Sequence, residues 1–212
     1  MAGKRLRVAV LASGRGSNLQ SLLDACAAEE FPASIALVIV NIPGAKAIDR
    51  ARSAGVPVAV IDHKAFASRE AFDAAIDREL QAASIGVVCL AGFMRLLTPG
   101  FVRTWAGRLI NIHPSLLPDF PGLDTHRRAL DSGSTEHGCT VHYVIAELDA
   151  GPIIAQAKVP VMPGDDEEAL AARVLAEEHR LYPQALRLIA EGKVRMVEGR
   201  VLVEGQPASG AG

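Results

Sequence analysis

The sequence predicts an α/β fold: a Rossmann-like, mostly parallel sheet with helices on both faces and an antiparallel C-terminal extension. Three observations predict it. Short apolar, β-branched runs alternate with longer helical patterns, which is typical of strand–helix–strand units. The runs are apolar on both sides, as expected for parallel strands covered on two faces. After residue 120 the pattern changes to two long strands joined by a short segment, which indicates an antiparallel pair.

The first elements follow from these runs. Val8-Ala9-Val10-Leu11 predicts a strand, and the glycine-rich turn after it leads into a helix. The predicted elements up to the third strand are a strand over 7–12, a helix over 18–28, a strand over 34–41, a helix over 45–54 and a strand over 56–61.

Helix-start signals mark the next two units. Ser68 is a favourable N-cap for a helix over 68–83. The apolar run 85–90 then predicts a fourth strand. Thr98-Pro99 combines an N-cap with proline at the first helical position, and 109–113 is predicted as the fifth strand.

The C-terminal part begins with the antiparallel pair. Asp165-x-x-Glu168 resembles a capping box and predicts the start of a long helix. The predicted elements are strands over 137–145 and 153–161, a helix from 165 to about 191, a terminal hairpin of strands 194–197 and 200–203, and a flexible tail over 205–212.

Size and composition restrict the class of protein. The chain of 212 residues, 50% hydrophobic, can form one substantial core, so we expect a single domain over 1–212. A net charge of -2 argues against general binding to nucleic acid. Three cysteines without a close pair predict neither a disulfide framework nor a four-cysteine zinc site. The N-terminal apolar run is too short for a signal peptide or a membrane span, so we expect a soluble cytoplasmic protein without membrane contact.

The loop Ser13-Gly14-Arg15-Gly16-Ser17-Asn18 follows the first strand and opens a helix. Glycines permit a tight turn, and the free N–H groups at a helix start attract an anion. An ordinary glycine-rich turn is the alternative. Leu19 replaces the third glycine of the dinucleotide motif, the second strand ends in Asn41 rather than an acid, and no Gly-Lys-Ser/Thr follows. NAD, FAD and ATP are therefore disfavoured, and a phosphate monoester fits better.

Asn111 and His113 lie two residues apart on the fifth strand, so their side chains point to the same side. An amide beside an imidazole can bind and protonate an oxygen on which negative charge develops. The carboxylate of Asp149 could support protonated His113, or it could cap a local turn. These residue types suit acyl-group transfer.

Each of three further motifs can be interpreted in two ways. His137, Cys139 and His142 invite a metal site, but strand alternation places His142 on the opposite face and no further Cys/His pair completes a ligand set. The run 90–97 is either a buried strand with a helix entry or the wall of a flat ligand pocket. The run Glu177-Glu178-His179 in the last long helix either lies on a solvated face or offers a carboxylate that binds sugar hydroxyls or an ammonium group.

The motif Asn111-x-His113-Pro114-Ser115-Leu116-Leu117-Pro118, with Pro121-Gly122 and Asp149-x-Gly151-Pro152-Ile153-Ile154-x-Gln156, resembles the 10-formyltetrahydrofolate-dependent formyltransferases. The resemblance covers the chain from Val8 to about Tyr182. The loop Gly14-x-Gly16-Ser17-Asn18-Leu19 and the chain length are similar to the members that formylate N1-(5-phosphoribosyl)glycinamide in purine biosynthesis.

The resemblance implies roles for individual residues. It implies a phosphate-binding half over about 1–110 and a catalytic, folate-binding half over about 111–204. The catalytic residues would be Asn111, His113 and Asp149. The phosphoribosylglycinamide site would comprise Gly16, Ser17, Asn18, Leu19, Gln20, Leu175 and Glu178. The folate site would comprise Arg69, Met94, Arg95, Leu96, Leu97, Asn111, Ile145, Ala146, Glu147, Leu148 and Asp149. Asp119 departs from several members, which have a basic residue there, and Arg15 from some that have Asn.

The expected partners are these two small molecules, with 10-formyltetrahydrofolate as a cosubstrate and no metal; the chain would be a monomer or homodimer. A formyltetrahydrofolate hydrolase and a non-catalytic phosphosugar- or folate-binding module are the alternatives. Methionyl-tRNA formyltransferase would need a C-terminal RNA-binding domain, for which we expect the chain to be too short.

Overall fold

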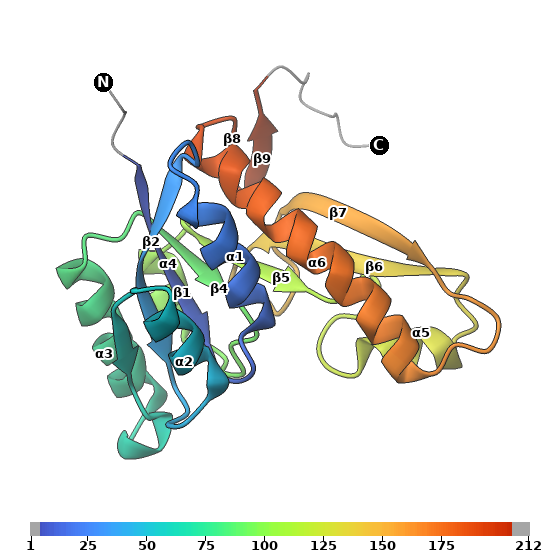
Figure 1. Cartoon of the computed structure of the whole chain (residues 1–212), viewed down its shortest axis with the longest axis horizontal. Coiled ribbons are helices and arrows are strands. Elements are labelled where there is room, and N and C mark those ends of the chain that lie inside the picture. Colours follow the sequence, from blue (N-terminus) through green and yellow to red (C-terminus); the bar gives the residue numbers. More distant parts are fainter. Residues whose placement is uncertain (1–4, 205–212) are drawn as a thin grey trace.

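A seven-stranded sheet in the order β3-β2-β1-β4-β5-β6-β7 forms the centre of the computed structural model, which describes residues 5–204 (Figure 1). Strands β1 to β5 pair in parallel, whereas β6 is antiparallel to both β5 and β7. The predicted fold class, a mostly parallel sheet with an antiparallel C-terminal extension, is confirmed.

The sheet strands are β1 (Leu6–Ala12), β2 (Ala33–Val40), β3 (Val58–Val60), β4 (Val87–Leu90), β5 (Leu109–His113), β6 (Glu136–Tyr143) and β7 (Ile153–Pro160). The helices are α1 (Ser17–Ala27), α2 (Lys46–Ser53), α3 (Arg69–Ala82), α4 (Pro99–Thr104), α5 (Thr125–Asp131) and α6 (Glu167–Ala190), with a 3₁₀ turn at His63–Ala65. The predicted terminal hairpin is confirmed as a separate sheet of β8 (Val194–Val197) and β9 (Arg200–Val203). The predicted tail over 205–212 lies outside the described residues.

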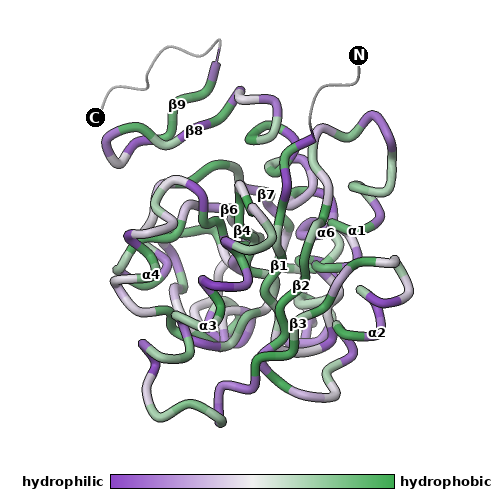
Figure 2. The backbone as a smooth tube through the Cα atoms, turned by 90° about the vertical axis from the view of Figure 1, so that its left-hand side faces the viewer, coloured by the Kyte–Doolittle hydropathy of each residue, from purple (hydrophilic) through white to green (hydrophobic). Residues whose placement is uncertain are grey.

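Apolar side chains on both faces of the sheet form two cores. In β1, Val8 and Val10 pack toward α1, α2 and α6, while Ala9 and Leu11 pack toward α3 and α4. This two-sided burial explains why the first strands are continuous apolar runs rather than alternating ones. Figure 2 shows these hydrophobic segments passing through the strands at the centre of the molecule.

Side-chain caps fix two of the predicted helix starts as expected. Ser68 Oγ accepts a hydrogen bond from the N–H of Ala71, and Thr98 Oγ1 accepts one from that of Phe101, so both predicted N-caps are confirmed. The predicted capping box at Asp165 is wrong: the cap is the next residue, and Ala169 rather than a glutamate stands three residues after it.

Asp166, not Asp165, caps α6, and its Oδ1 lies 2.8 Å from the N–H of Ala169. The carboxylate of Asp165 is engaged elsewhere: it accepts from the N–H of Met162 and pairs with Arg173 at 2.7 Å. Two adjacent aspartates could both serve as caps by sequence, and the Arg173 side chain decides between them.

Two local elements were not predicted. Helix α5 follows Asp124, whose backbone is left-handed and whose side chain makes no cap bond, so the usual start signal is missing. The turn at His63–Ala65 is too short for a periodic signal. In addition, β6 ends at Tyr143, two residues before the predicted boundary.

No helix within residues 5–204 has the length and apolarity needed to cross a membrane. The three cysteines are buried and unpaired.

Candidate active site

The loops that follow β1, β4 and β5 meet at the carboxyl edge of the sheet. The N–H of Ser13 donates to the carbonyl of Gly92 at 3.1 Å, and the N–H of Met94 donates to Ser13 Oγ at 2.7 Å. Leu90 at the end of β4 is the sheet partner of Asn111. The glycine-rich loop, the apolar run 90–97 and the Asn-x-His motif therefore lie side by side, as parallel strand ends require.

His113 lies between two acceptors. Its Nε2 donates to the carbonyl of Phe120 at 3.0 Å, and its Nδ1 lies 3.4 Å from Asp149 Oδ2. The side chains of His113 and Asp149 are only 6% and 9% exposed. A protonated imidazole would have an N–H on each of the two nitrogens that face these acceptors. The structure thus brings together the two residues that the sequence placed far apart.

Asp149 is positioned by a hydrogen bond from another loop and by an unusual backbone conformation. Its Oδ2 accepts from the N–H of Gly122 at 2.8 Å, and its φ of 52° is in the left-handed region. Phe120, which supplies the carbonyl to His113, has a φ of 53°. Non-glycine residues adopt this conformation only where the surrounding structure enforces it, and they are concentrated at functional sites.

Asn111 is oriented by His142, which lies opposite it in the β5–β6 register. The carbonyl of Tyr143 can only accept, so the Nδ1 of His142, 3.0 Å away, carries a proton. Burial lowers the pKa of His142, which favours a neutral ring with an unprotonated Nε2. That nitrogen lies 3.3 Å from Asn111 Nδ2 and accepts from the amide.

Sequence reasoning considered His142 only as a metal ligand and missed this orienting role. The sequence signal that could have revealed it is the register of the antiparallel pair, which places Asn111 beside His142. Within residues 5–204, no three His, Cys, Asp or Glu side chains gather as a metal site.

The start of α1 presents free N–H groups. Gly16 precedes the helix with a φ of 70°, and no side chain caps it. The first helical hydrogen bond is that of the Gln20 N–H to the carbonyl of Gly16, so the N–H groups of Ser17, Asn18 and Leu19 are available to an anion. A Cβ at Gly16 would lie 3.0 Å from Ala47 in α2, which is a second reason for glycine.

Glu178 on α6 reaches this helix start. Its Oε2 accepts from Asn18 Nδ2 at 2.8 Å, and burial raises the pKa of its carboxyl. Glu178 is 5% exposed, which excludes the solvated-face interpretation. Leu175 lies half-buried one turn earlier on α6. Leu19 is fully buried in the core, so of the predicted contacts it offers a ligand only its backbone.

The predicted folate residues lie mostly on two loops, and one of them, Arg69, lies on a helix and contacts the first loop. Arg69 at the start of α3 donates to the carbonyls of Leu96 and Leu97 and so holds the loop after β4. Met94, Leu96 and Leu148 are 65%, 62% and 57% exposed, an unusual display of large apolar side chains. The remaining predicted members lie on the same two loops: Arg95, Ile145, Ala146 and Glu147.

Two further histidines, His126 and His137, lie close enough to His113 to repel it electrostatically. The ring of His137 is 1% exposed and packs edge-on against Phe120 and His126. Burial, with repulsion from His126 and His113, lowers the pKa of His137 from 6.5 to about 4. The unfolded chain therefore binds a proton at a higher pH than the folded one.

We expect this difference to make stability depend on pH. Its contribution is present above pH 6.5 and is lost as the pH falls toward 4, because only the unfolded state then takes up the proton. The slope of the unfolding free energy against pH reports how many more protons the unfolded state binds than the folded state. In urea unfolding between pH 4 and 7.5, His137→Phe should lower this slope by an amount equivalent to up to about one bound proton. Equal slopes in the two proteins would contradict this assignment.

Gly151 shapes the corner between Asp149 and β7. A Cβ at Gly151 would overlap the carbonyl oxygen of Tyr143. We expect Gly151→Ala to lower the unfolding free energy by about 1–3 kcal/mol, and also to reduce turnover, because Asp149 must move. Gly100→Ala in α4 is the matched control, since a Cβ there has its nearest neighbour at 3.9 Å. Urea unfolding and activity would be measured for both, and equal behaviour would refute the steric explanation.

An amide, an imidazole and a carboxylate at the carboxyl edge of an α/β sheet form the kind of arrangement that can stabilise an oxyanion in group transfer. The sequence model of the family named Formyl transferase matches residues 6–186. The chain belongs to the formyl transferase family.

Individual relatives agree with this assignment. The phosphoribosylglycinamide formyltransferase of Escherichia coli K12 is 47% identical over 95% of both chains. The trifunctional purine biosynthetic protein adenosine-3 of Drosophila pseudoobscura is 55% identical over 91% of this chain, which spans only 14% of that protein.

Solved structures share the fold. Glycinamide ribonucleotide transformylase 1 of Symbiobacterium toebii superposes with a TM-score of 0.91, 49% identity and 95% coverage of both chains. A formyltetrahydrofolate deformylase of Pseudomonas syringae superposes with a TM-score of 0.88 and 30% identity over 95% of this chain and 67% of that one.

Proposed function

We propose that this chain transfers the formyl group of 10-formyltetrahydrofolate to the amine of N1-(5-phosphoribosyl)glycinamide in purine biosynthesis. The products are the N-formyl compound and tetrahydrofolate. The observation that carries the proposal is the contact of His113 with Asp149 at the end of the strand that also bears Asn111.

The chemistry needs no covalent enzyme intermediate. The substrate amine attacks the formyl carbon, and the carbonyl oxygen becomes an oxyanion. The Asn111 amide donates to this oxygen through the N–H that does not face His142. Protonated His113 keeps its Nε2 hydrogen bond to the Phe120 carbonyl and donates to the oxyanion from Nδ1, which makes no close hydrogen bond to Asp149 at 3.4 Å, and the charge of the Asp149 carboxylate stabilises the imidazolium. As the bond from carbon to N10 breaks, N10 gains a proton and the attacking nitrogen loses one.

The surrounding residues suit the two substrates. The uncapped start of α1 binds the phosphate, and Glu178 beside Asn18 binds the rest of the phosphoribosyl compound. The folate lies against the exposed apolar side chains of the loops after β4 and β6, with Arg69 holding the first of these loops.

Two other functions would use parts of the same site. A hydrolase would pass the formyl group to water, which needs the catalytic residues but not the glycine-rich loop Ser13-Gly14-Arg15-Gly16-Ser17-Asn18, called the phosphate loop from here on. A binding module would need neither an imidazole nor a carboxylate beside Asn111. The phosphate loop and the Asn111, His113 and Asp149 cluster occur together in this chain, which favours transfer to a phosphorylated amine.

One assay separates these possibilities. Purified protein is incubated with 10-formyltetrahydrofolate, with and without N1-(5-phosphoribosyl)glycinamide, and tetrahydrofolate and formate are measured. We expect tetrahydrofolate to form only with the amine present and without free formate. Formate release without the amine would indicate a hydrolase, and saturable binding without either product would indicate a binding module.

Four expectations stay predictions: that no metal is required, that the chain is a monomer or homodimer, that it is cytoplasmic, and that it divides into two functional halves.

A further inference from the structure

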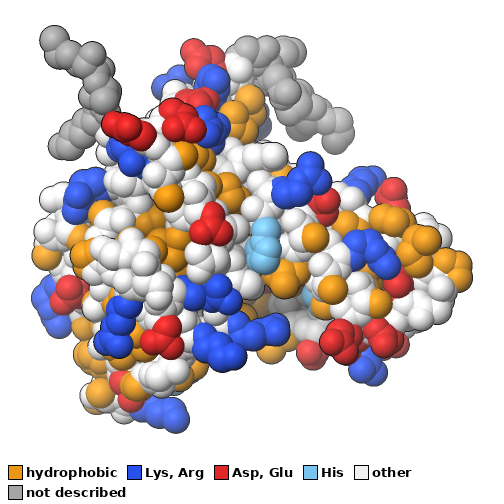
Figure 3. Space-filling model, viewed as in Figure 1, with side chains coloured by type: hydrophobic (Ala, Val, Ile, Leu, Met, Phe, Trp, Pro, Cys, Tyr) orange, Lys and Arg blue, Asp and Glu red, His pale blue; other side chains and the backbone are white. Residues whose placement is uncertain are grey.

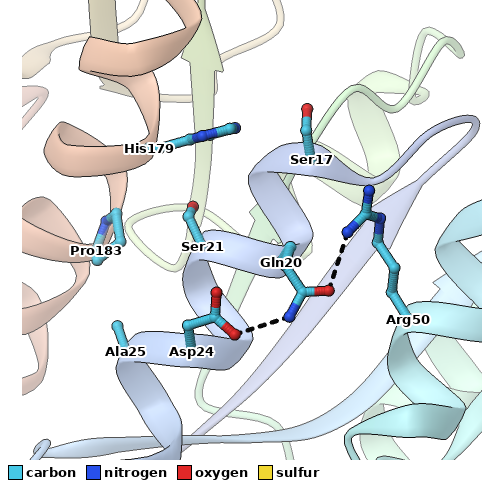
Figure 4. Close-up of a pocket in the computed structure, with 8 residues that line it drawn as sticks. All are labelled: Ser17, Gln20, Ser21, Asp24, Ala25, Arg50, His179 and Pro183. Atoms are coloured by element: carbon cyan, nitrogen blue, oxygen red, sulfur yellow. Dashed lines mark hydrogen bonds between the residues drawn. The ribbon is translucent and has the colours of Figure 1, made fainter.

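Helix α2 packs directly against the phosphate loop. The N–H of Ala47 donates to the carbonyl of Gly14 at 3.1 Å, and Arg50 Nε donates to the carbonyl of Arg15 at 2.9 Å. Arg50 Nη1 also donates to Gln20 Oε1 at 3.1 Å (Figure 4). A single arginine therefore holds both the loop before α1 and the first turn of α1.

The charge of Arg50 is not neutralised by the protein. Within residues 5–204, Arg50 belongs to none of the salt bridges, and its Nη2 donates to no protein acceptor. Its acceptors are a neutral carbonyl and a neutral amide. A half-buried guanidinium with a free donor, fixed beside a helix start, is arranged to meet an anion.

A hollow of about 490 Å³ opens beside Arg50, between α1 and α6. Ser17 and Gln20 line it from α1, and His179 lines it from α6, opposite Arg50 (Figure 4). The Nε2 of His179 is buried and makes no hydrogen bond within the described part of the chain. In Figure 3, basic side chains gather near the middle of the same face.

We propose that Arg50 is a specificity-determining residue that binds the phosphate monoester of the substrate through its free guanidinium donor while holding the phosphate loop in place. This inference rests on the proposed function and adds a residue outside the predicted site. Because a guanidinium binds phosphate oxygens by charge-assisted hydrogen bonds, the effect belongs to substrate affinity rather than to the chemical step.

The test compares Arg50→Gln and Arg50→Lys with Arg52→Gln, an exposed arginine on the same helix that loses the same charge. For Arg50→Gln we expect the KM for phosphoribosylglycinamide to rise about 10- to 100-fold. The kcat and the KM for 10-formyltetrahydrofolate should change less than about threefold. Arg50→Lys should restore part of the affinity, and Arg52→Gln should behave as wild type.

Binding without turnover gives a second readout. Calorimetric titration with phosphoribosylglycinamide, and inhibition by inorganic phosphate, should both weaken in Arg50→Gln. If wild type transfers formyl and Arg50→Gln binds both ligands normally, the inference is overturned and the proposed function stands. If Arg50→Gln instead loses kcat and both KM values deteriorate together, Arg50 is only structural and the inference also fails. If wild type transfers no formyl group, the proposed function fails, and calorimetric titration of wild type and Arg50→Gln with inorganic phosphate still decides the role of Arg50.

Discussion

Replacing His113 by alanine is expected to lower the kcat of formyl transfer by about 10²- to 10⁴-fold. The imidazolium donates to the developing oxyanion from Nδ1, while the Phe120 carbonyl holds Nε2 in place and the charge of Asp149 lies 3.4 Å from Nδ1. The loss should appear in kcat, because the interaction strengthens only as the oxyanion forms. Steady-state assays with both substrates saturating measure it.

The alanine variant could also lose activity by disturbing the fold, since His113 is buried. His113→Gln separates the two causes, because its amide can still donate to the Phe120 carbonyl but does not transfer a proton. We expect both variants to bind tetrahydrofolate in calorimetry as wild type does, and both to be nearly inactive. Turnover of His113→Gln within threefold of wild type would show that the imidazole is not the proton donor.

The sequence was sufficient for elements with local causes. The parallel strands were predictable because continuous apolar runs must be buried on two faces, as in β1. The starts of α3 and α4 were predictable because Ser68 and Thr98 act on N–H groups three residues away. Each of these signals depends on neighbours in the chain, and no tertiary contact competes with it.

Features decided by distant contacts were not predictable. By sequence, Asp165 and Asp166 are equally good caps, and the ion pair of Arg173 with Asp165 leaves Asp166 as the cap. The orientation of Asn111 depends on its register with His142, 31 residues away in the chain. Arg50 belongs to a helix with no site motif, and its role follows only from the packing of α2 on the phosphate loop. The two unpredicted site residues thus share a cause: each acts through a neighbour that lies on another element.

Asp149→Asn is expected to lower kcat by on the order of 10²-fold or more while leaving the fold intact. Asparagine tolerates the left-handed backbone at this position, and its Oδ1 can still accept from the N–H of Gly122. The substitution therefore removes the negative charge beside His113 and little else. Without that charge the imidazolium is less stable, and proton transfer during the collapse of the oxyanion slows.

Asp124→Asn is the matched control, because Asp124 has a φ of 56°, follows closely after Gly122 and is exposed. It loses the same charge in the same backbone conformation, away from the imidazole. We expect Asp124→Asn to keep the wild-type kcat, and both variants to unfold in urea within about 0.5 kcal/mol of wild type, as for other surface or isosteric changes. Equal kcat values for the two variants would show that the carboxylate of Asp149 acts as a turn residue, the alternative that the sequence left open, and would remove the charge from the mechanism.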